Sequence, residues 1–231
     1  MCMKDNFFLK TRELLKKMKF IYLPYKRLKI GFISKYRHHK LHTTGYVILN
    51  ELTSIFEKTD YVFFAACGTM LGIVRDGAFI SHDDDMDFGV VYSESFSWQE
   101  FESILNEHGY KKDHEYSFDG QITEMCFRKY NTLFDVFLFL ENENKQNYSY
   151  GYYFNEKNGT YTCLKCKCPI IEKCIKVDVG GKAHALIPAN HIEYIVANYG
   201  DTWRTPDLDF HRELLPMVET IENAPAKRVD Y

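Results

Sequence analysis

Four aspartates lie within five consecutive positions, at Asp83, Asp84, Asp85 and Asp87. Carboxylates this close repel one another unless a cation or strong hydrogen-bond donors lie among them. Residues 85–91 begin with alternating acidic and apolar side chains, and a period of two predicts a strand that places Asp85 and Asp87 on one face. Oxygen-only ligation of this kind suits Mg²⁺ or Mn²⁺. The pattern therefore predicts a metal site in which Asp83 is an additional candidate ligand.

The segment before these acids predicts an anion-binding turn. Residues 61–67 form a short apolar run of strand character, after which Gly68 and Thr69 lead into a helical pattern. A helix that begins behind a glycine offers free backbone N–H groups to an anion. Arg75 follows within two turns and would present a planar fork of donors, while Gly77 would end the helix. We therefore expect Gly68, Thr69 and Arg75 to bind a substrate phosphate.

The remaining apolar patterns predict an α+β domain with one further acid in its sheet. Helices are expected over 48–56, from Ser97 to Gly109 and from Pro188 to Gly200, and further strands over 122–130, 133–140, 148–154 and 161–168. The strands at 122–130 and 133–140 would form a hairpin that brings Asp135 into the sheet. An acid among apolar neighbours is unfavourable to bury unless it is paired or ligated. The alternative interpretation of Asp135 is a solvated residue on an edge strand.

Length and composition fit one catalytic domain in residues 45–231. The chain has 231 residues, of which 45% are hydrophobic and 16% aromatic, enough to build a substantial core. The sequence contains no run of eighteen or more apolar residues, and its basic start lacks the apolar stretch of a secretory signal. We therefore expect a cytoplasmic protein, either soluble or peripheral on the inner face of the membrane.

Residues 1–44 form a separate basic arm in this interpretation. Residues 1–42 carry twelve Lys or Arg and two acids, whereas the rest of the chain is acidic. Apolar residues recur at helical spacing among the lysines, which describes a basic amphipathic helix. Attachment to an anionic membrane surface is one interpretation. A helix packed on the body or on a second protomer is another, and nucleic-acid binding is not expected because the body is acidic and lacks a nucleic-acid motif.

A cluster of cysteines raises the question of structural zinc. The CxxCxC pattern of Cys163, Cys166 and Cys168 is followed by Cys174, and four thiolates can close a zinc site. The spacing lacks the second CxxC of an ordinary zinc ribbon. Buried cysteines that act as small apolar residues are therefore the preferred interpretation, with Zn²⁺ as the alternative.

The acidic segment and its neighbours resemble a known family. Residues 68–75 (GTMLGIVR) and 79–89 (FISHDDDMDFG) are similar to the signature of the LicD family, which includes bacterial phosphocholine transferases and the fukutin and fukutin-related ribitol-phosphate transferases. Residues 134–137 (FDVF) resemble the family's Asp-hydrophobic-Phe strand, and residues 187–206 resemble its C-terminal Tyr-Gly-Asp and Pro element. The resemblance spans roughly residues 45–210.

The sequence departs from the family pattern at two positions. Ser81 and His82 stand where the family usually has Pro and Trp. Both lie beside the metal acids, so the shape of the pocket is expected to differ while the number of carboxylates does not.

The resemblance implies a nucleotidyltransferase-like fold, a mixed sheet flanked by helices, whose acids hold a divalent metal. By position, Asp85 and Asp87 would be the metal pair, and Asp135 would complete the metal shell or act as the base. The implied reaction moves phosphocholine, or glycerol or ribitol phosphate, from a CDP-linked donor to a sugar hydroxyl of a lipopolysaccharide, capsule or teichoic-acid type of glycan, which could be lipid-linked. The alternatives are a nucleotidyltransferase that releases diphosphate and a catalytically silent binding protein of the same fold.

Overall fold

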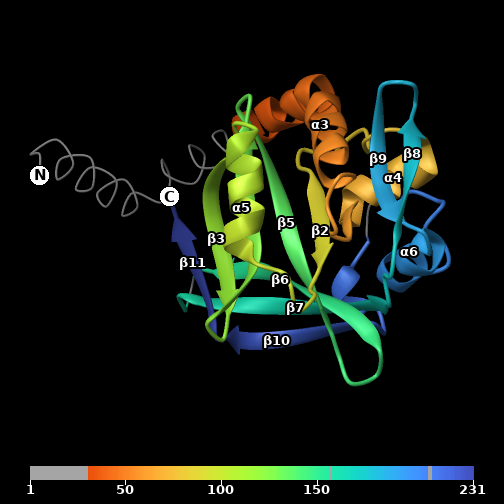
Figure 1. Ribbon diagram of the computed structural model, residues 1–231. Helices are drawn as coiled ribbons and strands as arrows, with labels where there is room; N and C mark the ends of the chain where they lie inside the picture. Colours follow the sequence, from red (N-terminus) through yellow and green to blue (C-terminus); the bar gives the residue numbers. More distant parts are fainter. Residues whose placement is uncertain (1–30, 157, 208–209) are drawn as a thin grey trace, which may run out of the picture.

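A long, mostly antiparallel sheet is the scaffold of the protein (Figure 1). The computed structural model describes residues 31–156, 158–207 and 210–231. The helices are η1 (Leu41–Gly45), α3 (Tyr46–Phe56), α4 (Cys67–Asp76), α5 (Trp98–Glu107), α6 (His191–Tyr199) and η2 (Arg212–Leu214). The strands are β1 (Phe63–Ala65), β2 (Asp87–Val91), β3 (Lys111–Phe118), β4 (Gln121–Lys129), β5 (Thr132–Glu141), β6 (Gln146–Asn155), β7 (Thr160–Pro169), β8 (Cys174–Val179), β9 (Ala183–Pro188), β10 (Val218–Ala224) and β11 (Ala226–Asp230).

The strand order makes the sheet both mixed and strongly curved. Its path runs β10–β7–β6–β5–β4–β3–β11, and β2 joins it by pairing in parallel with β5, while β1 pairs with β2. Strands β6, β7 and β10 cross below the ends of β3 and β5 (Figure 1). Because β10 and β11 lie at opposite ends of the path yet are joined through Pro225, the two ends of the sheet approach each other. This curvature creates a hollow on the inner face.

Aromatic packing fixes the opposite face of the sheet. The ring of Phe56 in α3 stacks on Phe63 of β1 and on Phe101 of α5, with centroids 4.1 and 4.8 Å apart. Phe63 in turn stacks on Phe88 of β2 at 5.2 Å. All four side chains are buried, and burying a large apolar side chain contributes roughly 1.5–3 kcal/mol. The cluster therefore holds β2 so that its alternate residues project from the inner face.

The N-terminal part of the described chain is one continuous helix. Residues 31–40 are helical and lead through η1 directly into α3, so the predicted boundary between arm and body at residue 44 falls inside this helix. Leu41 is buried, and the hydroxyls of Thr44 and Thr132 lie 2.6 Å apart. The start of the predicted amphipathic helix, residues 1–30, lies outside the described residues. No helix in the described ranges is both long and apolar enough to span a bilayer.

The α+β class and most predicted elements are confirmed. The hairpin of β4 and β5 pairs as expected, and the Ser97 hydroxyl accepts a hydrogen bond from the backbone N–H of Glu100 at the start of α5. Gly77 ends α4 with a φ of 65°, the left-handed conformation of a glycine cap. Strand β3, the β8–β9 hairpin and strands β10 and β11 were not predicted. Strands β3, β10 and β11 are rich in charged residues and lack the apolar alternation that identifies a half-buried strand. Strand β8 does carry this alternation, at Ile175, Val177 and Val179.

Candidate active site

The site is built on a lateral row of side chains that crosses four strands. His114 of β3 pairs with Cys126 of β4, Cys126 with Asp135 of β5, and Asp135 with Asp87 of β2. Residues in register on adjacent strands project from the same face of a sheet. The predicted alternation of β2 is confirmed, because Met86 lies in the core at 0% exposure while Asp87 lines the opposite face. The fold therefore brings Asp87 and Asp135, separated by 48 positions in the sequence, side by side.

This row forms the floor of a cavity of about 450 Å³ on the inner face of the sheet. The charged residues that line it are Asp85, Asp87, Asp113, Glu124, Asp135, His114, Arg37, Arg212 and Arg228. Acidic side chains gather on the floor formed by β2, β4 and β5. The arginines come from the N-terminal helix, η2 and β11, so cationic groups reach the acids from other elements.

Burial and mutual repulsion make the floor electrostatically unfavourable without a cation. Burial raises the pKa of Asp87 well above its usual value, and Asp85 and Asp135 raise it further, while Arg212 lowers it. Burial also raises the pKa of Asp135, whose Oδ1 atom is buried and has no hydrogen-bond partner among the described residues. Carboxylates in this state are stabilised by a hard divalent cation. Asp85, Asp87 and Asp135 offer the carboxylate oxygens that Mg²⁺ or Mn²⁺ prefers. Two groups with ligand atoms within 4.8 Å of one another contain members of this set: Asp83, Asp84 and Asp85 form one, and His114, Glu124 and Asp135 form the other.

Asp83 lies against the start of α4 and next to the other acids. Its carboxylate packs so close to Gly68 that a Cβ atom at Gly68 would lie 2.9 Å from Asp83 Oδ2. Burial and the neighbouring Asp85 raise the pKa of Asp83 to about 7. Gly68 thus permits the approach of a carboxylate to the helix N-terminus. The Asp83 carboxylate therefore occupies the place at the start of α4 where we expected a substrate phosphate.

Thr69 supports Asp87 and does not line the cavity. Its hydroxyl oxygen accepts a hydrogen bond from the backbone N–H of Asp87 at 2.9 Å, and the side chain is 2% exposed. The hydroxyl therefore ties the first turn of α4 to the start of β2. We expected Thr69 to contact the substrate phosphate directly, but the structure places it one layer behind the acids.

The structure does not bring Arg75 to the acidic cavity. Its guanidinium forms two hydrogen bonds with the carboxylate of Asp76, at 2.9 and 2.7 Å, and lines a separate hollow beside Tyr199 and Trp203. The physical reason is distance along the helix, because six residues of α-helix separate Arg75 from Thr69 by about 9 Å. The expected grouping of Gly68, Thr69 and Arg75 around one phosphate is therefore not observed.

Arg212 occupies the position that we had expected for Arg75. It is directed to the cavity from η2, where its guanidinium donates to the Tyr199 hydroxyl at 3.2 Å and contacts Cys67 Sγ at 3.8 Å. Arg212 was not predicted as a site residue, because it follows the last predicted helix in a polar segment without periodicity. Glu124 was also missed, although an acid inside the apolar strand at 122–130 is the same signal that identified Asp135.

The cysteine positions do not support the zinc alternative. Strand alternation separates Cys163 from Cys166 and Cys168, because Cys163 packs against Tyr150 and Ala224 while Cys166 faces the acidic cavity. Burial raises the pKa of all these thiols and of Cys174, as expected of small side chains packed among apolar neighbours. Among the described residues, these cysteines do not form a group of potential metal ligands. Buried cysteine thiols, the preferred interpretation, agree with this arrangement.

Aromatic side chains form another wall of the cavity. Tyr116 and Tyr152 stack with ring centroids 4.8 Å apart, and Tyr150 and Tyr153 of β6 also line the hollow. Phe154, the next residue, is 54% exposed and lies outside the lining. The cavity therefore combines an acidic floor, three arginines and a tyrosine wall.

Comparison with known proteins supports the resemblance to the LicD family. Residues 60–166 match the family described as LicD/FKTN/FKRP, nucleotidyltransferase domain, and this segment contains Asp85, Asp87 and Asp135. The resemblance of the acidic segment to the LicD family is thereby confirmed over these residues. The match favours a transferase.

A relative among curated proteins adds a similarity but no activity. An uncharacterized protein of Rickettsia typhi is 25% identical over 145 residues, which make up 61% of this chain and 44% of that protein. The chain therefore spans less than half the length of this curated relative.

Proposed function

We propose that this protein is a metal-dependent phosphotransferase that moves a phospho-alcohol from a CDP-linked donor to a sugar hydroxyl of a cell-surface glycan. The alcohol phosphate would be phosphocholine, or glycerol or ribitol phosphate. The convergence of Asp85, Asp87 and Asp135 on the floor of one cavity is the observation that carries the proposal. The LicD-family match over the same residues supports it.

The side chains of the cavity suit phosphoryl transfer, which needs positioning and charge stabilisation more than covalent help. Asp85, Asp87 and Asp135 would hold Mg²⁺ or Mn²⁺, which neutralises diphosphate charge when bound. Arg212 would donate hydrogen bonds to phosphate oxygens. The acceptor oxygen would form a bond to the phosphorus of the alcohol phosphate while the bridging bond to CMP breaks. Asp135 would accept the hydroxyl proton if it acts as the base and does not complete the metal shell.

A second hollow beside the cavity supports a separate approach for the acceptor. This hollow, of about 310 Å³, lies between the N-terminal helix and the β4–β5 turn and shares Arg37, Asp85 and Leu133 with the acidic cavity. Lys40 and Arg128 also line it. A donor in the cavity and an acceptor in the hollow would meet at Asp85. Cationic walls suit an acceptor that carries phosphate, as a lipid-linked sugar does.

The N-terminal helix would bring the enzyme to a membrane that holds such an acceptor. Phe32, Ile33 and Tyr36 are 75%, 42% and 45% exposed, and Lys35 and Lys40 lie among them in the sequence. Exposed apolar and basic groups on one helix suit an anionic lipid surface. The end of this helix packs on the body through Leu41, which supports the packed-helix interpretation there, while membrane binding by the exposed part stays a proposal.

Product analysis tests the proposal directly. The purified protein with Mg²⁺ should release CMP from one member of a panel of CDP-choline, CDP-ethanolamine, CDP-glycerol and CDP-ribitol when a sugar acceptor is present. Release of diphosphate from CTP and a phospho-alcohol would instead identify a nucleotidyltransferase. Binding of CDP compounds without turnover of any of them would indicate a binding protein.

Substitution in the tyrosine wall tests whether the donor carries choline. A quaternary ammonium is bound by aromatic faces, so Tyr150→Leu and Tyr152→Leu should weaken CDP-choline binding more than CDP-glycerol binding. Phe154→Leu is the matched control, because this residue of the same strand lies outside the cavity. Equal losses for both donors would favour a polyol phosphate or a wall that binds the cytidine.

A further inference from the structure

A second group of potential metal ligands lies next to the Asp85 and Asp87 pair. One ligand atom each from His114, Glu124 and Asp135 lies within 4.8 Å of the others. They project from the neighbouring strands β3, β4 and β5 into the same cavity. This group differs chemically from the aspartate cluster because it contains an imidazole.

Two members of this group are carboxylates in a buried environment. Glu124 is 6% exposed and interacts with the like charges of Asp135 and Asp87 and with the opposite charge of Arg228. Oδ1 of Asp135 is buried and lacks a hydrogen-bond partner among the described residues. A buried carboxylate oxygen without a partner is strongly unfavourable unless a cation joins it. The unpartnered oxygen of Asp135 and the like charge of Glu124 beside it therefore point to a cation between the two carboxylates.

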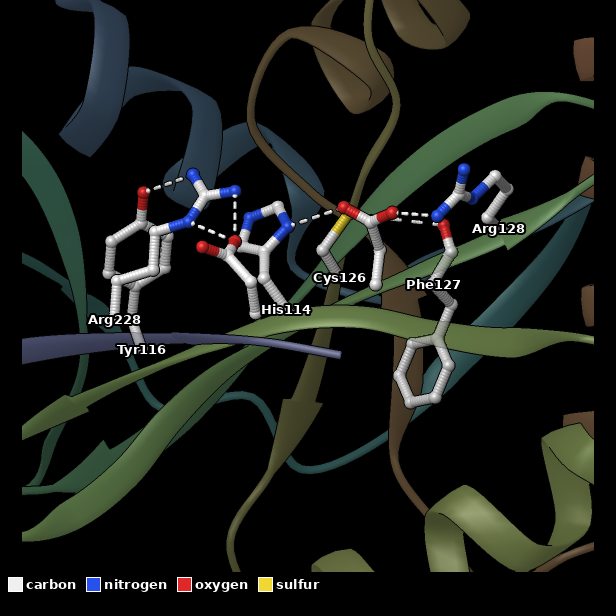
Figure 2. A network of polar contacts seen from close by, with 8 residues as sticks. His114, Tyr116, Cys126, Phe127, Arg128 and Arg228 are labelled. Carbon is white, nitrogen blue, oxygen red and sulfur yellow. Dashed lines mark hydrogen bonds and ion pairs between the residues drawn. The ribbon is translucent and has the colours of Figure 1, made fainter. Parts of the chain in front are cut away.

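The third member, His114, has a carboxylate partner of the kind that accompanies many metal-binding histidines. Its Nδ1 lies 3.0 Å from Oδ2 of Asp113, and Arg128 binds the other oxygen of that carboxylate, in the network that Figure 2 shows around His114. When Nδ1 donates to Asp113, the lone pair on Nε2 is left free. Histidines that bind metals commonly donate their other ring N–H to a carboxylate in this way.

We propose that His114, Glu124 and Asp135 bind a second divalent cation, and that Asp135 bridges it to the cation held by Asp85 and Asp87. Mixed imidazole and carboxylate ligation favours a transition metal such as Zn²⁺ or Mn²⁺, whereas the oxygen-only site suits Mg²⁺. When bound, this cation would supply charge neutralisation on the side of the cavity lined by Tyr116 and Arg228. The inference rests on the proposed function only through the shared Asp135.

Metal stoichiometry tests the second site without an activity assay. Metal-free full-length protein titrated with Mn²⁺ and followed by electron paramagnetic resonance should bind two ions per chain. His114→Ala and Glu124→Gln should each bind one, and Asp85→Asn should also bind one. Asp135→Asn should weaken both sites. Asp113→Asn, which leaves His114 in place but removes its orienting carboxylate, should weaken the second site about 10- to 100-fold.

Two controls separate loss of a ligand from loss of structure. Glu124→Gln keeps the shape of the side chain and removes a buried charge, so its thermal stability without metal should be unchanged or higher. His108→Ala alters a histidine at the end of α5 that is outside the cavity, and it should retain both ions.

Two results would overturn the proposal. In the first, both His114→Ala and Glu124→Gln still bind two ions per chain. In the second, the unaltered protein binds only one ion, and only Asp85→Asn abolishes its binding. The second result would assign His114 as a charge partner of the buried carboxylates. A chain that binds two ions but transfers no phospho-alcohol would support the second site and contradict the proposed function.

Discussion

The hydroxyl of Thr69 holds the backbone N–H of Asp87 at 2.9 Å and thereby joins the first turn of α4 to the first residue of β2. Thr69→Val keeps the side-chain shape but leaves this buried N–H without an acceptor, which costs about 1–3 kcal/mol. We expect the free energy of unfolding to fall by that amount and Mg²⁺ to bind more weakly, as measured by denaturation and calorimetry.

Thr69→Ser is the matched control for this prediction, because it retains the hydroxyl. Thr69→Ser should bind Mg²⁺ as tightly as the unaltered protein does, even if loss of the methyl group lowers the free energy of unfolding. Equal metal affinity in Thr69→Val and the unaltered protein would show that the bond has no part in placing Asp87.

Asp87→Asn should separate catalysis from folding. The amide removes one of the charges that repel Asp85 and Asp135, so thermal stability without metal should be unchanged or higher, while transferase turnover should be abolished. Added Mg²⁺ should raise the melting temperature of the unaltered protein more than that of the variant. Near-normal turnover in both Asp85→Asn and Asp87→Asn would contradict the assignment of these residues as the metal pair.

The raised pKa of Asp83, about 7, predicts how pH affects the metal-free protein. In the folded protein Asp83 holds a proton at pH values where the same side chain in the unfolded chain has released it. The contribution of this protonated Asp83 to the free energy of unfolding is therefore complete below the ordinary aspartate pKa, and it is lost as pH rises through about 7. Denaturation measured from pH 5 to 8 should show falling stability without metal.

Saturating Mg²⁺ should flatten this dependence, because a bound cation favours the ionised carboxylates. For the same reason, the affinity for Mg²⁺ should increase as pH rises through about 7. Asp83→Asn provides the control, and an unchanged pH slope in that variant would exclude Asp83 as its source.

The acids on β2 and β5 could be predicted from the sequence, whereas their electrostatic partners could not. Asp85, Asp87 and Asp135 interrupt apolar patterns, and a buried charge in such a pattern is visible without a structure. Arg212 and His114 lie in polar segments, where a charged residue is unremarkable until the fold shows what it faces. Arg75 was misplaced for a related reason, since proximity in sequence to Thr69 does not determine which side of α4 reaches the cavity.

The exposed side chains of the N-terminal helix predict membrane binding that depends on both charge and apolar area. Phe32→Ser should reduce sedimentation with anionic liposomes while leaving thermal stability unchanged, because this side chain is 75% exposed. Rising salt should weaken binding of the unaltered protein, since each basic residue near anionic lipid contributes about 1 kcal/mol.

Phe154→Ser is the control for this experiment, as it removes an exposed aromatic side chain from β6. It should sediment like the unaltered protein. Salt-insensitive binding, or equal loss in both variants, would favour a helix that packs on another protein surface.

Substitution of Arg212 and of Arg75 compares two candidates for binding the donor phosphate. The structure places Arg212 in the cavity, whereas Arg75 was suggested by its position in the sequence. Arg212→Lys keeps the positive charge but loses the planar fork that reaches Tyr199 and the cavity. We expect it to weaken binding of a CDP-linked donor and to lower kcat/KM by about 10-fold or more, since a hydrogen bond to a charged group contributes about 1.5–3 kcal/mol. Arg75→Lys alters a pair with Asp76 in which the Arg75 side chain is 11% exposed and the Asp76 side chain 39%, and because this pair lies outside the acidic cavity the change should leave donor binding unchanged. Calorimetry with the donor and Mg²⁺ distinguishes the two, and a larger loss of affinity in Arg75→Lys would assign phosphate binding to the hollow beside Tyr199 and Trp203.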